Sequence, residues 1–388
     1  MPEDNAHLPT PHLLRGKRIA IVGGGPAGLT LARLLQMNDV RVHVFERDVE
    51  AHARLQGGSL DLHEKSGQLA LDRCGLTGHF STVARPEGQA TCVIDKHGVR
   101  RAASAVDDEE ESRPEIDRGA LRDLLLSSLD EDTVIWGSPP CAILPEANRH
   151  RLVFERRQAE LFDLVIGADG LRSKVRPLIT PIKSFYSGVT FIETRLSNVD
   201  DRHPEIARYV GPGNVLALGD NKGLLAQRNG DGSIRVYISR RIPEHWIRDN
   251  KIGVEGAAQT RERLLAWFPD WAPALLEMVR QSEDHFLLWP LYAFPPDQTW
   301  TTRPGLTILG DAAHVMPPFL GQGANMAMLD AVELTDHLLG GRFPTLTETI
   351  EAFERSMRAR MAPLIRASLE TQNLLFEEDA PNDLVATF

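Results

Sequence analysis

A glycine-rich turn near the start of the chain constrains its fold more than any other feature. Residues 23–28 read Gly-Gly-Gly-Pro-Ala-Gly, after the apolar run 18–22 and before a helical pattern of leucines that continues to residue 35. Gly23 permits a tight turn, Gly25 lets the backbone approach a pyrophosphate, and Gly28 lets the helix pack on the strand. The helix N-terminus then offers free N–H groups to phosphates. The pattern predicts a dinucleotide-binding βαβ unit.

The acidic residue that accompanies this turn is also present. The run 41–46 predicts a second strand, and Glu46 ends it, about 20 residues beyond the last glycine of the turn. A carboxylate at this place can accept both hydrogen bonds of a ribose diol, and it would repel a 2′-phosphate. The unit therefore favours FAD or NAD over NADP.

Length and charge limit what else the chain can do. Its 388 residues exceed the size of a single hydrophobic core, which rarely grows beyond about 300 residues, so we expect two domains. The formal net charge of −11 argues against a nucleic-acid or membrane partner. The polar start lacks an export signal, which favours a cytoplasmic protein. Three dispersed cysteines predict buried thiols instead of a disulfide or zinc site, namely Cys74, Cys92 and Cys141.

Patterning predicts an α/β protein with an inserted antiparallel sheet. Residues 1–15 read as a frayed tail. Further strands are expected at 133–136, 161–166 and 306–309, antiparallel strands at 214–218 and 233–238, and helices at 121–129, 325–339 and 345–376. Pro363 marks a kink in the last helix. We expect a Rossmann-like cofactor domain from 1–178 and 296–342, a substrate domain from 179–295, and a C-terminal helix from 343–388. That helix either bridges both domains at the substrate entrance or packs as an ordinary core helix.

Two further motifs follow in order. Residues 163–176 predict a strand, the turn Asp169-Gly170 and a basic helix start. Residues 309–325 run from a strand through Gly310-Asp311 and Gly321-Gln322-Gly323 into a helix. With all three motifs, the chain resembles the class A flavoprotein monooxygenases, the hydroxylases related to para-hydroxybenzoate hydroxylase, along nearly its whole length. The resemblance implies bound FAD. Asp169 is either a direct contact or a plain turn residue, and we expect His314 to be a hydrogen-bonded helix-start residue.

A closer resemblance lies in residues 46–48, 53–63, 113–118, 132–136 and 310–319, which are similar to the tetracycline-inactivating flavin monooxygenases. It implies that Arg47, Asp61, Arg118 and Asp311 contact FAD and that Arg54 contacts NADPH, with Arg122 as the alternative to Arg118. The full set of expected cofactor-binding residues is Gly23, Gly25, Ala27, Gly28, Glu46, Arg47, Arg54, Asp61, Arg118, Asp311, Pro318, Gly321, Gln322, Gly323 and Ala324.

The substrate residues depart from that family. Its members hold the drug with a glutamine, an arginine and a histidine, and these places fall here at Glu193, Val215 and Arg235. Valine in place of arginine removes a hydrogen-bond donor. Glutamate in place of glutamine can only accept, so the ligand would have to donate. These three residues and Phe319 are the candidate substrate contacts. Tetracycline specificity, with its antibiotic-resistance role, stays one option among polyketide and phenolic substrates.

The resemblance also implies a reaction. NADPH or NADH reduces FAD, O₂ forms a hydroperoxide at flavin C4a, and an electron-rich phenol or enol carbon of an aromatic or polyketide substrate takes up the distal oxygen. We expect no metal ion and no catalytic side chain, because the cofactor carries the chemistry, and we expect a monomer. The alternatives are an oxidase, reductase or halogenase on the same scaffold, or a non-catalytic flavin-dependent binding protein.

Overall fold

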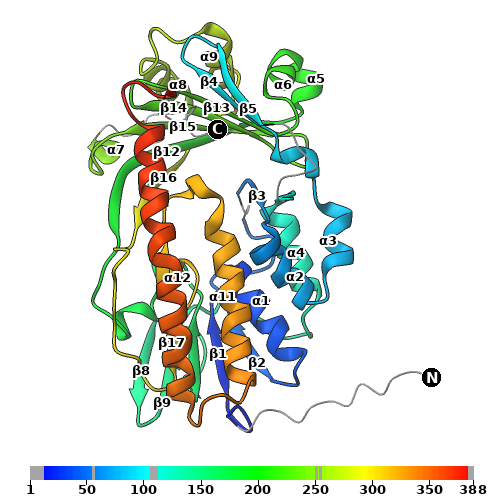
Figure 1. Cartoon of the computed structure of the whole chain (residues 1–388), viewed down its shortest axis with the longest axis vertical. Coiled ribbons are helices and arrows are strands. Elements are labelled where there is room, and N and C mark those ends of the chain that lie inside the picture. Colours follow the sequence, from blue (N-terminus) through cyan, green and yellow to red (C-terminus); the bar gives the residue numbers. More distant parts are fainter. Residues whose placement is uncertain (1–12, 55–56, 105–111, 250–251, 253–255, 383–388) are drawn as a thin grey trace, which may run out of the picture.

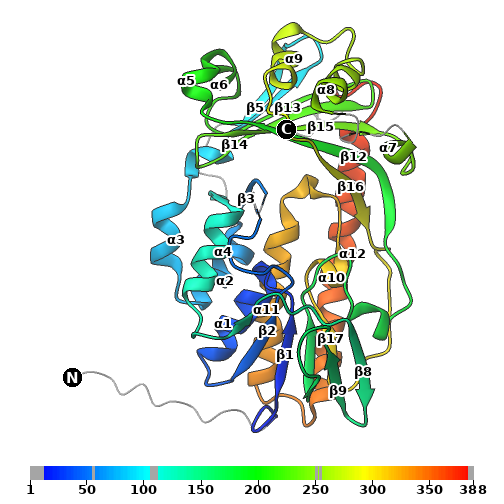
Figure 2. The ribbon, with the colours of Figure 1, turned by 180° about the vertical axis from the view of Figure 1, so that it is seen from behind.

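Two β-sheets, one above the other, organise the molecule (Figures 1 and 2). The computed structural model describes residues 13–54, 57–104, 112–249, 252 and 256–382. Within these ranges each helix is too short or too polar to cross a bilayer. The expected tail at 1–15 lies mostly outside them, and the part that is described is not frayed, because Leu13 and Leu14 are buried.

The lower sheet is parallel and carries the glycine turn. Its strand order is β17-β11-β1-β2-β7, from Leu306–Ile308, Leu164–Gly167, Ile19–Val22, Val42–Phe45 and Val134–Ile135. β1, with four fully or almost fully buried residues, lies at the centre, as an apolar run between glycines predicts. Helix α1 (Pro26–Gln36) packs on β1 and β2, and α11 (Gln322–Leu339) and α4 (Arg118–Ser127) pack against α1. The Rossmann-like α/β fold expected from the sequence is confirmed.

The run 161–166, which the sequence predicts as one strand, forms two. β10 (Glu160–Phe162) belongs to a small antiparallel sheet with β9 (Arg149–Val153) and β8 (Ala142–Glu146), whereas β11 belongs to the parallel sheet. The break falls at Asp163, whose Oδ2 accepts a hydrogen bond from the backbone N–H of Arg18 at 2.9 Å. A polar residue tied to the neighbouring chain thus ends one strand and starts the next.

The upper sheet has seven strands and forms the expected inserted sheet. Its order is β16-β12-β15-β14-β13-β4-β5, from Leu287–Ala293, Phe185–Leu196, Ile234–Arg241, Lys222–Arg228, Asn214–Gly219, Thr91–Asp95 and Arg100–Ser104. The last two strands come from within the range 1–178 that the sequence assigns to the cofactor domain. β4 pairs in parallel with β13 through residues 91–95, a long-range contact that local patterning does not predict.

The two faces of the upper sheet meet different surroundings. One face is apolar and is covered by α6 (Pro204–Val210), α8 (Ala257–Leu265) and α9 (Pro273–Arg280). The other face points toward the lower sheet and carries Phe191, Leu225 and Tyr237. The remaining described elements are β3 (Ser59–Asp61) paired with β6 (Glu115–Asp117), α2 (Leu69–Arg73), α3 (Thr77–Val83), α5 (Val199–Arg202), α7 (Trp246–Asp249), α10 (Asp311–His314), and the short turns η1 (Glu64–Gln68), η2 (Pro86–Gln89), η3 (Arg176–Leu178) and η4 (Pro318–Leu320).

Helix α12 (Leu346–Leu375) runs from beside the lower sheet up to the upper sheet (Figure 1). Near its start, Glu354 accepts a hydrogen bond from Thr307 of β17 at 2.9 Å. Near its end, Gln372 bonds Ser187 of β12, and Phe376 contacts Phe319. The helix continues through Pro363. It therefore bridges both sheets.

The cysteines are less uniform than the sequence predicts. Cys74 is buried, and burial raises the pKa of its thiol to about 12. Cys92 is half-buried and Cys141 is exposed, so the expectation that all three are buried is wrong. Cys141 directly precedes β8 on a small sheet that solvent reaches.

Candidate active site

The glycine turn packs closely on one side and is open on the other. Gly23 has a φ of +109°, and a Cβ there would collide with the carbonyl oxygen of Ala168 at the end of β11. A Cβ on Gly28 would collide with the carbonyl oxygen of Gly23, whereas a Cβ on Gly25 would meet nothing within 4 Å. Gly23 and Gly28 thus let the backbone pack, and the backbone at Gly25 is left open beside the start of α1. This is the arrangement that a pyrophosphate needs.

Glu46 is buried at the end of β2, beside the turn. Its Oε2 accepts a hydrogen bond from the N–H of Gly24 at 2.5 Å, and its Oε1 accepts one from the N–H of Asp48 at 3.0 Å. Each carboxylate oxygen keeps a further lone pair for a ribose hydroxyl. Glu46 therefore holds the turn against β2 and still fits the ribose role that the sequence predicts. Ala27 follows in the first turn of α1 and is buried.

Arginines surround the next carboxylate, Asp48. Arg54 Nε lies 3.0 Å from Asp48 Oδ1, and the buried Arg122 lies 3.0 Å from Oδ2. Burial raises the pKa of Asp48, but the hydrogen bonds and charges of these two arginines outweigh it, and the net shift is downward. Arg47 and Arg118 are exposed. The structure thus places Arg122 in a structural ion pair and leaves Arg118 open to a ligand.

The Asp-Gly motif supports the Gly-Asp motif. Asp169 Oδ2 accepts a hydrogen bond from the N–H of Lys174 at 2.6 Å, which orders the loop that leads to Arg176. The buried Arg176 donates to the carbonyls of Ala312 and Ala313 in α10, and burial lowers its pKa to about 10. Asp311 at the start of α10 is exposed. Asp169 therefore supports the position of α10 through this loop and Arg176. The exposed Asp311 can contact a ligand.

His314 is a structural residue. Its Nε2 lies 2.6 Å from Oδ2 of the fully buried Asp330, and Arg360 of α12 lies 2.5 Å from the other oxygen of that carboxylate. Asp330 Oδ2 also accepts the N–H of Gly310 at 2.8 Å. These contacts tie the Gly-Asp motif to α11 and α12, and they are the hydrogen-bonded surroundings that we expect for His314.

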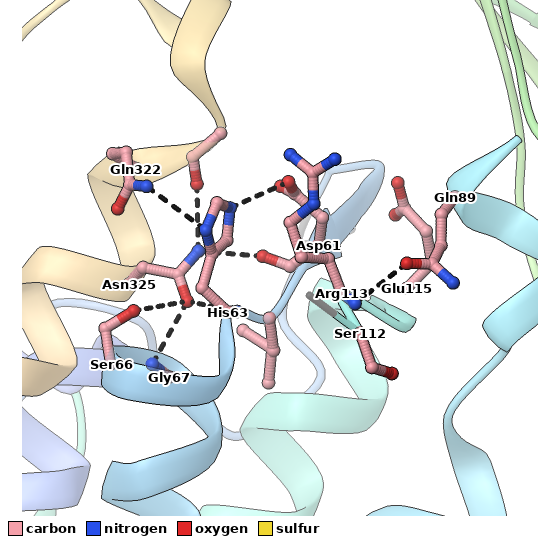
Figure 3. Close-up of polar contacts among 12 residues, drawn as sticks. Asp61, His63, Ser66, Gly67, Gln89, Ser112, Arg113, Glu115, Gln322 and Asn325 are labelled. Atoms are coloured by element: carbon pink, nitrogen blue, oxygen red, sulfur yellow. Dashed lines mark hydrogen bonds and ion pairs between the residues drawn. The ribbon is translucent and has the colours of Figure 1, made fainter. Parts of the chain in front are cut away.

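Asp61 and the start of α11 lie together (Figure 3). Gly321 has a φ of +65°, and a Cβ there would lie 2.5 Å from the Asp61 carboxylate. A Cβ on Gly323 would meet nothing within 4 Å, Pro318 is exposed, and Gln322 and Ala324 are half-buried. The N-terminal turn of α11 is thus open at Gly323 and bordered by an acid, which fits the ring of a bound flavin.

The candidate substrate residues divide between the two faces of the upper sheet. Glu193 and Arg235 form a buried ion pair on the face toward the lower sheet, and Trp289 Nε1 donates to Glu193 Oε2 at 2.8 Å. The ring of Phe319 packs edge-on against Phe191 of this face, with 5.8 Å between ring centroids. Val215 is fully buried on the opposite face, among the residues under α8 and α9. The structure therefore does not bring Val215 to the site.

Gly58 and Ser59, where β3 begins, contact this face. The N–H of Ser59 donates to Gln227 Oε1 at 3.0 Å, and a Cβ on Gly58 would lie 2.8 Å from the hydroxyl of Tyr237. Burial raises the pKa of Tyr237 to about 12, with a further contribution from Glu193. The cofactor half and the substrate sheet are therefore in direct contact.

Sequence reasoning missed several residues of this region. Trp289, Gln227 and Asn325 received no role, and His63 appeared only within a matching segment. A tryptophan within the apolar run 286–294 was the one local signal, because a large aromatic ring on a half-exposed strand is often a binding residue. Gln227, Asn325 and His63 are recognised only by their contacts in the folded protein.

Comparisons with known proteins identify the family. An FAD-binding domain model matches residues 289–341, and an NAD(P)-binding Rossmann-like domain model matches residues 21–55. The chain is 31% identical to the monooxygenase penA of Penicillium thymicola over 369 residues, which cover 83% of this chain and 84% of that protein. The chain belongs to the FAD-dependent monooxygenases. The resemblance seen in the sequence, and with it the expectation of an FAD enzyme, is confirmed.

Solved structures agree on the fold. HpxO of Klebsiella pneumoniae, complexed with FAD and uric acid, aligns with a TM-score of 0.78 at 19% identity, over 97% of this chain and 92% of that chain. Tetracycline destructase Tet(51) aligns with a TM-score of 0.70 at 18% identity, over 96% of this chain and 94% of that chain. These likenesses extend to both sheets.

Proposed function

We propose that this monooxygenase uses NADPH or NADH to hydroxylate a planar, electron-rich phenol or enol ring, such as that of a polyketide. The observation that supports this proposal is the Trp289–Glu193–Arg235 cluster. Trp289 is 48% exposed although its indole N–H is tied to a buried carboxylate. An anchored ring with an open face is suited to stacking on a planar substrate.

The charges of the cluster indicate the substrate's polarity. Glu193 and Arg235 compensate each other, so an uncharged ring meets no unpaired charge there. The Nε of Arg235 is buried and has no hydrogen-bond partner among the described residues. The ion pair thus needs no charged ligand, and we expect a neutral ring beside Trp289.

The cofactor residues fit FAD. The open backbone at Gly25 and Gly323, the spare lone pairs of Glu46 and the exposed Asp311 would hold it, and FAD supplies the redox and oxygen-transfer chemistry when bound. The chain's own part is to orient the ring and to exclude water. The contact of the Gly58 loop with Gln227 and Tyr237 serves the second purpose.

In this proposal, residues 1–178 and 296–342 supply the cofactor site, and residues 179–295, joined by β4 and β5, supply the substrate sheet. HpxO with uric acid supports a small planar ring as ligand in this family's fold. The tetracycline destructases support a polycyclic one. Val215 lies on the other face of the substrate sheet, so the match of this position to a drug-binding arginine does not carry over and gives no preference between these ligands.

A ligand panel tests the proposal. One would measure NADPH and NADH consumption and product mass with tetracyclines, other polyketides, indoles and simple phenols. We expect one class to accelerate consumption and to gain one oxygen atom. Consumption with hydrogen peroxide as the sole product for every ligand would indicate an oxidase instead. Flavin reduction without any oxygenated product would support a binding protein.

A further inference from the structure

His63 lies in a chain of three side chains at the start of α11 (Figure 3). Its Nδ1 is 3.1 Å from Gln322 Nε2, and its Nε2 is 3.0 Å from Asp61 Oδ2. With the Gln322 amide in this orientation, its Nε2 donates to Nδ1, and the ring proton lies on Nε2. His63 then donates to Asp61. With the proton on Nδ1 instead, the bond to Asp61 would be lost.

Asn325 makes this arrangement rigid. It is fully buried, and its Oδ1 accepts hydrogen bonds from the N–H groups of His63 at 2.9 Å and Gly67 at 3.1 Å. Its Nδ2 donates to the carbonyls of Asp61 at 2.8 Å and Gly321 at 2.9 Å. Asn325 of α11 thereby holds three backbone groups of the segment 61–67, and it also bonds Gly321 at the start of its own helix. These bonds keep His63 and Gln322 next to each other.

Asp61 is the more exposed end of this series of hydrogen-bonded side chains. The His63 side chain is 9% exposed, but that of Asp61 is 28% exposed and lies against Gly321, where α11 begins. His63 holds only Oδ2 of the carboxylate, and Oδ1 accepts no hydrogen bond from the described residues. A hydrogen bond to one oxygen fixes the rotamer and leaves the other oxygen as an acceptor.

We propose that His63 is a positioning residue, which orients Asp61 so that its free oxygen accepts a hydrogen bond from a hydroxyl or N–H group of FAD. The inference rests on the proposed placement of FAD along α11. Gln322 fixes the tautomer of His63, and Asn325 fixes the backbone around it. In the same way, hydrogen-bond partners outside a metal's coordination sphere orient the side chains that bind the metal.

A double-mutant cycle on FAD affinity tests the proposal. His63→Phe removes the donor, and we expect it to weaken FAD binding about tenfold, the effect of one lost hydrogen bond to a charged group. His63→Gln returns an N–H near the position of Nε2 and should restore binding to within about threefold. In an Asp61→Ala background, His63→Phe should have no further effect, because it acts through Asp61.

Additive effects of the two substitutions, or a His63→Gln variant as weak as His63→Phe, would overturn the inference. If His63→Phe fails to fold, nitrogen NMR of histidine-labelled wild-type protein with FAD decides instead. We expect the Nε2–H tautomer for His63. The Nδ1–H tautomer would contradict the proposed hydrogen bond from His63 to Asp61. Wild-type protein that binds no FAD would refute the proposed cofactor site itself, which is a separate outcome.

Discussion

The cofactor half and the substrate sheet differ in what determines their sites. Around the glycine turn, backbone groups carry the geometry: Gly23 avoids a collision with Ala168, and Glu46 bonds two backbone N–H groups. On the substrate sheet, side chains from three separate strands carry it, namely Glu193, Arg235 and Trp289. The backbone geometry of the turn restricts which residue types can occupy neighbouring positions in the sequence. A cluster of side chains from separate strands can be formed by many different residue combinations.

This difference predicts that substitutions act differently in the two halves. The fold itself is shared with structures below 20% identity. Substituting a side chain on a strand changes the ligand and leaves the sheet intact. Substituting a glycine of the turn changes the backbone itself.

The largest effect is expected at Gly23. Gly23→Ala introduces a Cβ at a φ of +109° and against a backbone oxygen, so we expect a loss of about 4 kcal/mol in the free energy of unfolding, with loss of FAD. Gly25→Ala is the matched control, because its Cβ meets nothing within 4 Å. It should change stability by less than about 0.5 kcal/mol and still weaken FAD binding about tenfold. Urea unfolding and flavin titration measure both. Equal stability losses in the two variants would contradict this assignment.

The joint between the halves should respond to pH through Glu115. This residue of β6 is buried, and its Oε1 lies 3.5 Å from Asn214 Nδ2 of the substrate sheet. Burial raises its pKa from 4.5 to about 7, with a smaller upward contribution from Asp61. The folded state therefore binds the proton more tightly than the unfolded state. This contribution favours folding below about pH 4.5 and is lost as the pH rises through about 7.

Glu115→Gln removes this dependence. Relative to the variant, the wild-type protein should lose up to about 3 kcal/mol of stability between pH 4.5 and pH 8. Chemical unfolding of both proteins at several pH values measures the difference. A difference that stays constant across this range would show that Glu115 does not titrate as its burial implies.

The smallest effect is expected on the substrate sheet. Trp289→Ala should raise the KM for the substrate about fivefold, because a stacking ring contributes on the order of 1 kcal/mol, and FAD affinity should stay unchanged. Leu144→Ala truncates an equally exposed apolar residue on β8, away from the site, and serves as the control. Steady-state kinetics with the ligand found in the panel give the answer. Weaker FAD binding in Trp289→Ala would place this residue in the cofactor half.

The sequence predicted the parts that short spacings determine. The strands at 18–22 and 41–46, the helices at 325–339 and 345–376, and the three motifs all lie where the patterns indicated. The pairing of β4 with β13, the burial of Val215 and the contact of Trp289 with Glu193 were not predictable in this way, because each depends on residues far apart in the chain. The face on which Val215 lies depends on strand register, and a register is set by the whole sheet.

The most direct test of the account is the flavin content of the purified protein and of Gly25→Ala. We expect wild-type protein to carry or take up stoichiometric FAD, seen in its visible absorption spectrum, and Gly25→Ala to fold normally but to bind FAD about tenfold more weakly. A folded wild-type protein that binds no flavin, or a Gly25→Ala variant with unchanged FAD affinity, would contradict it.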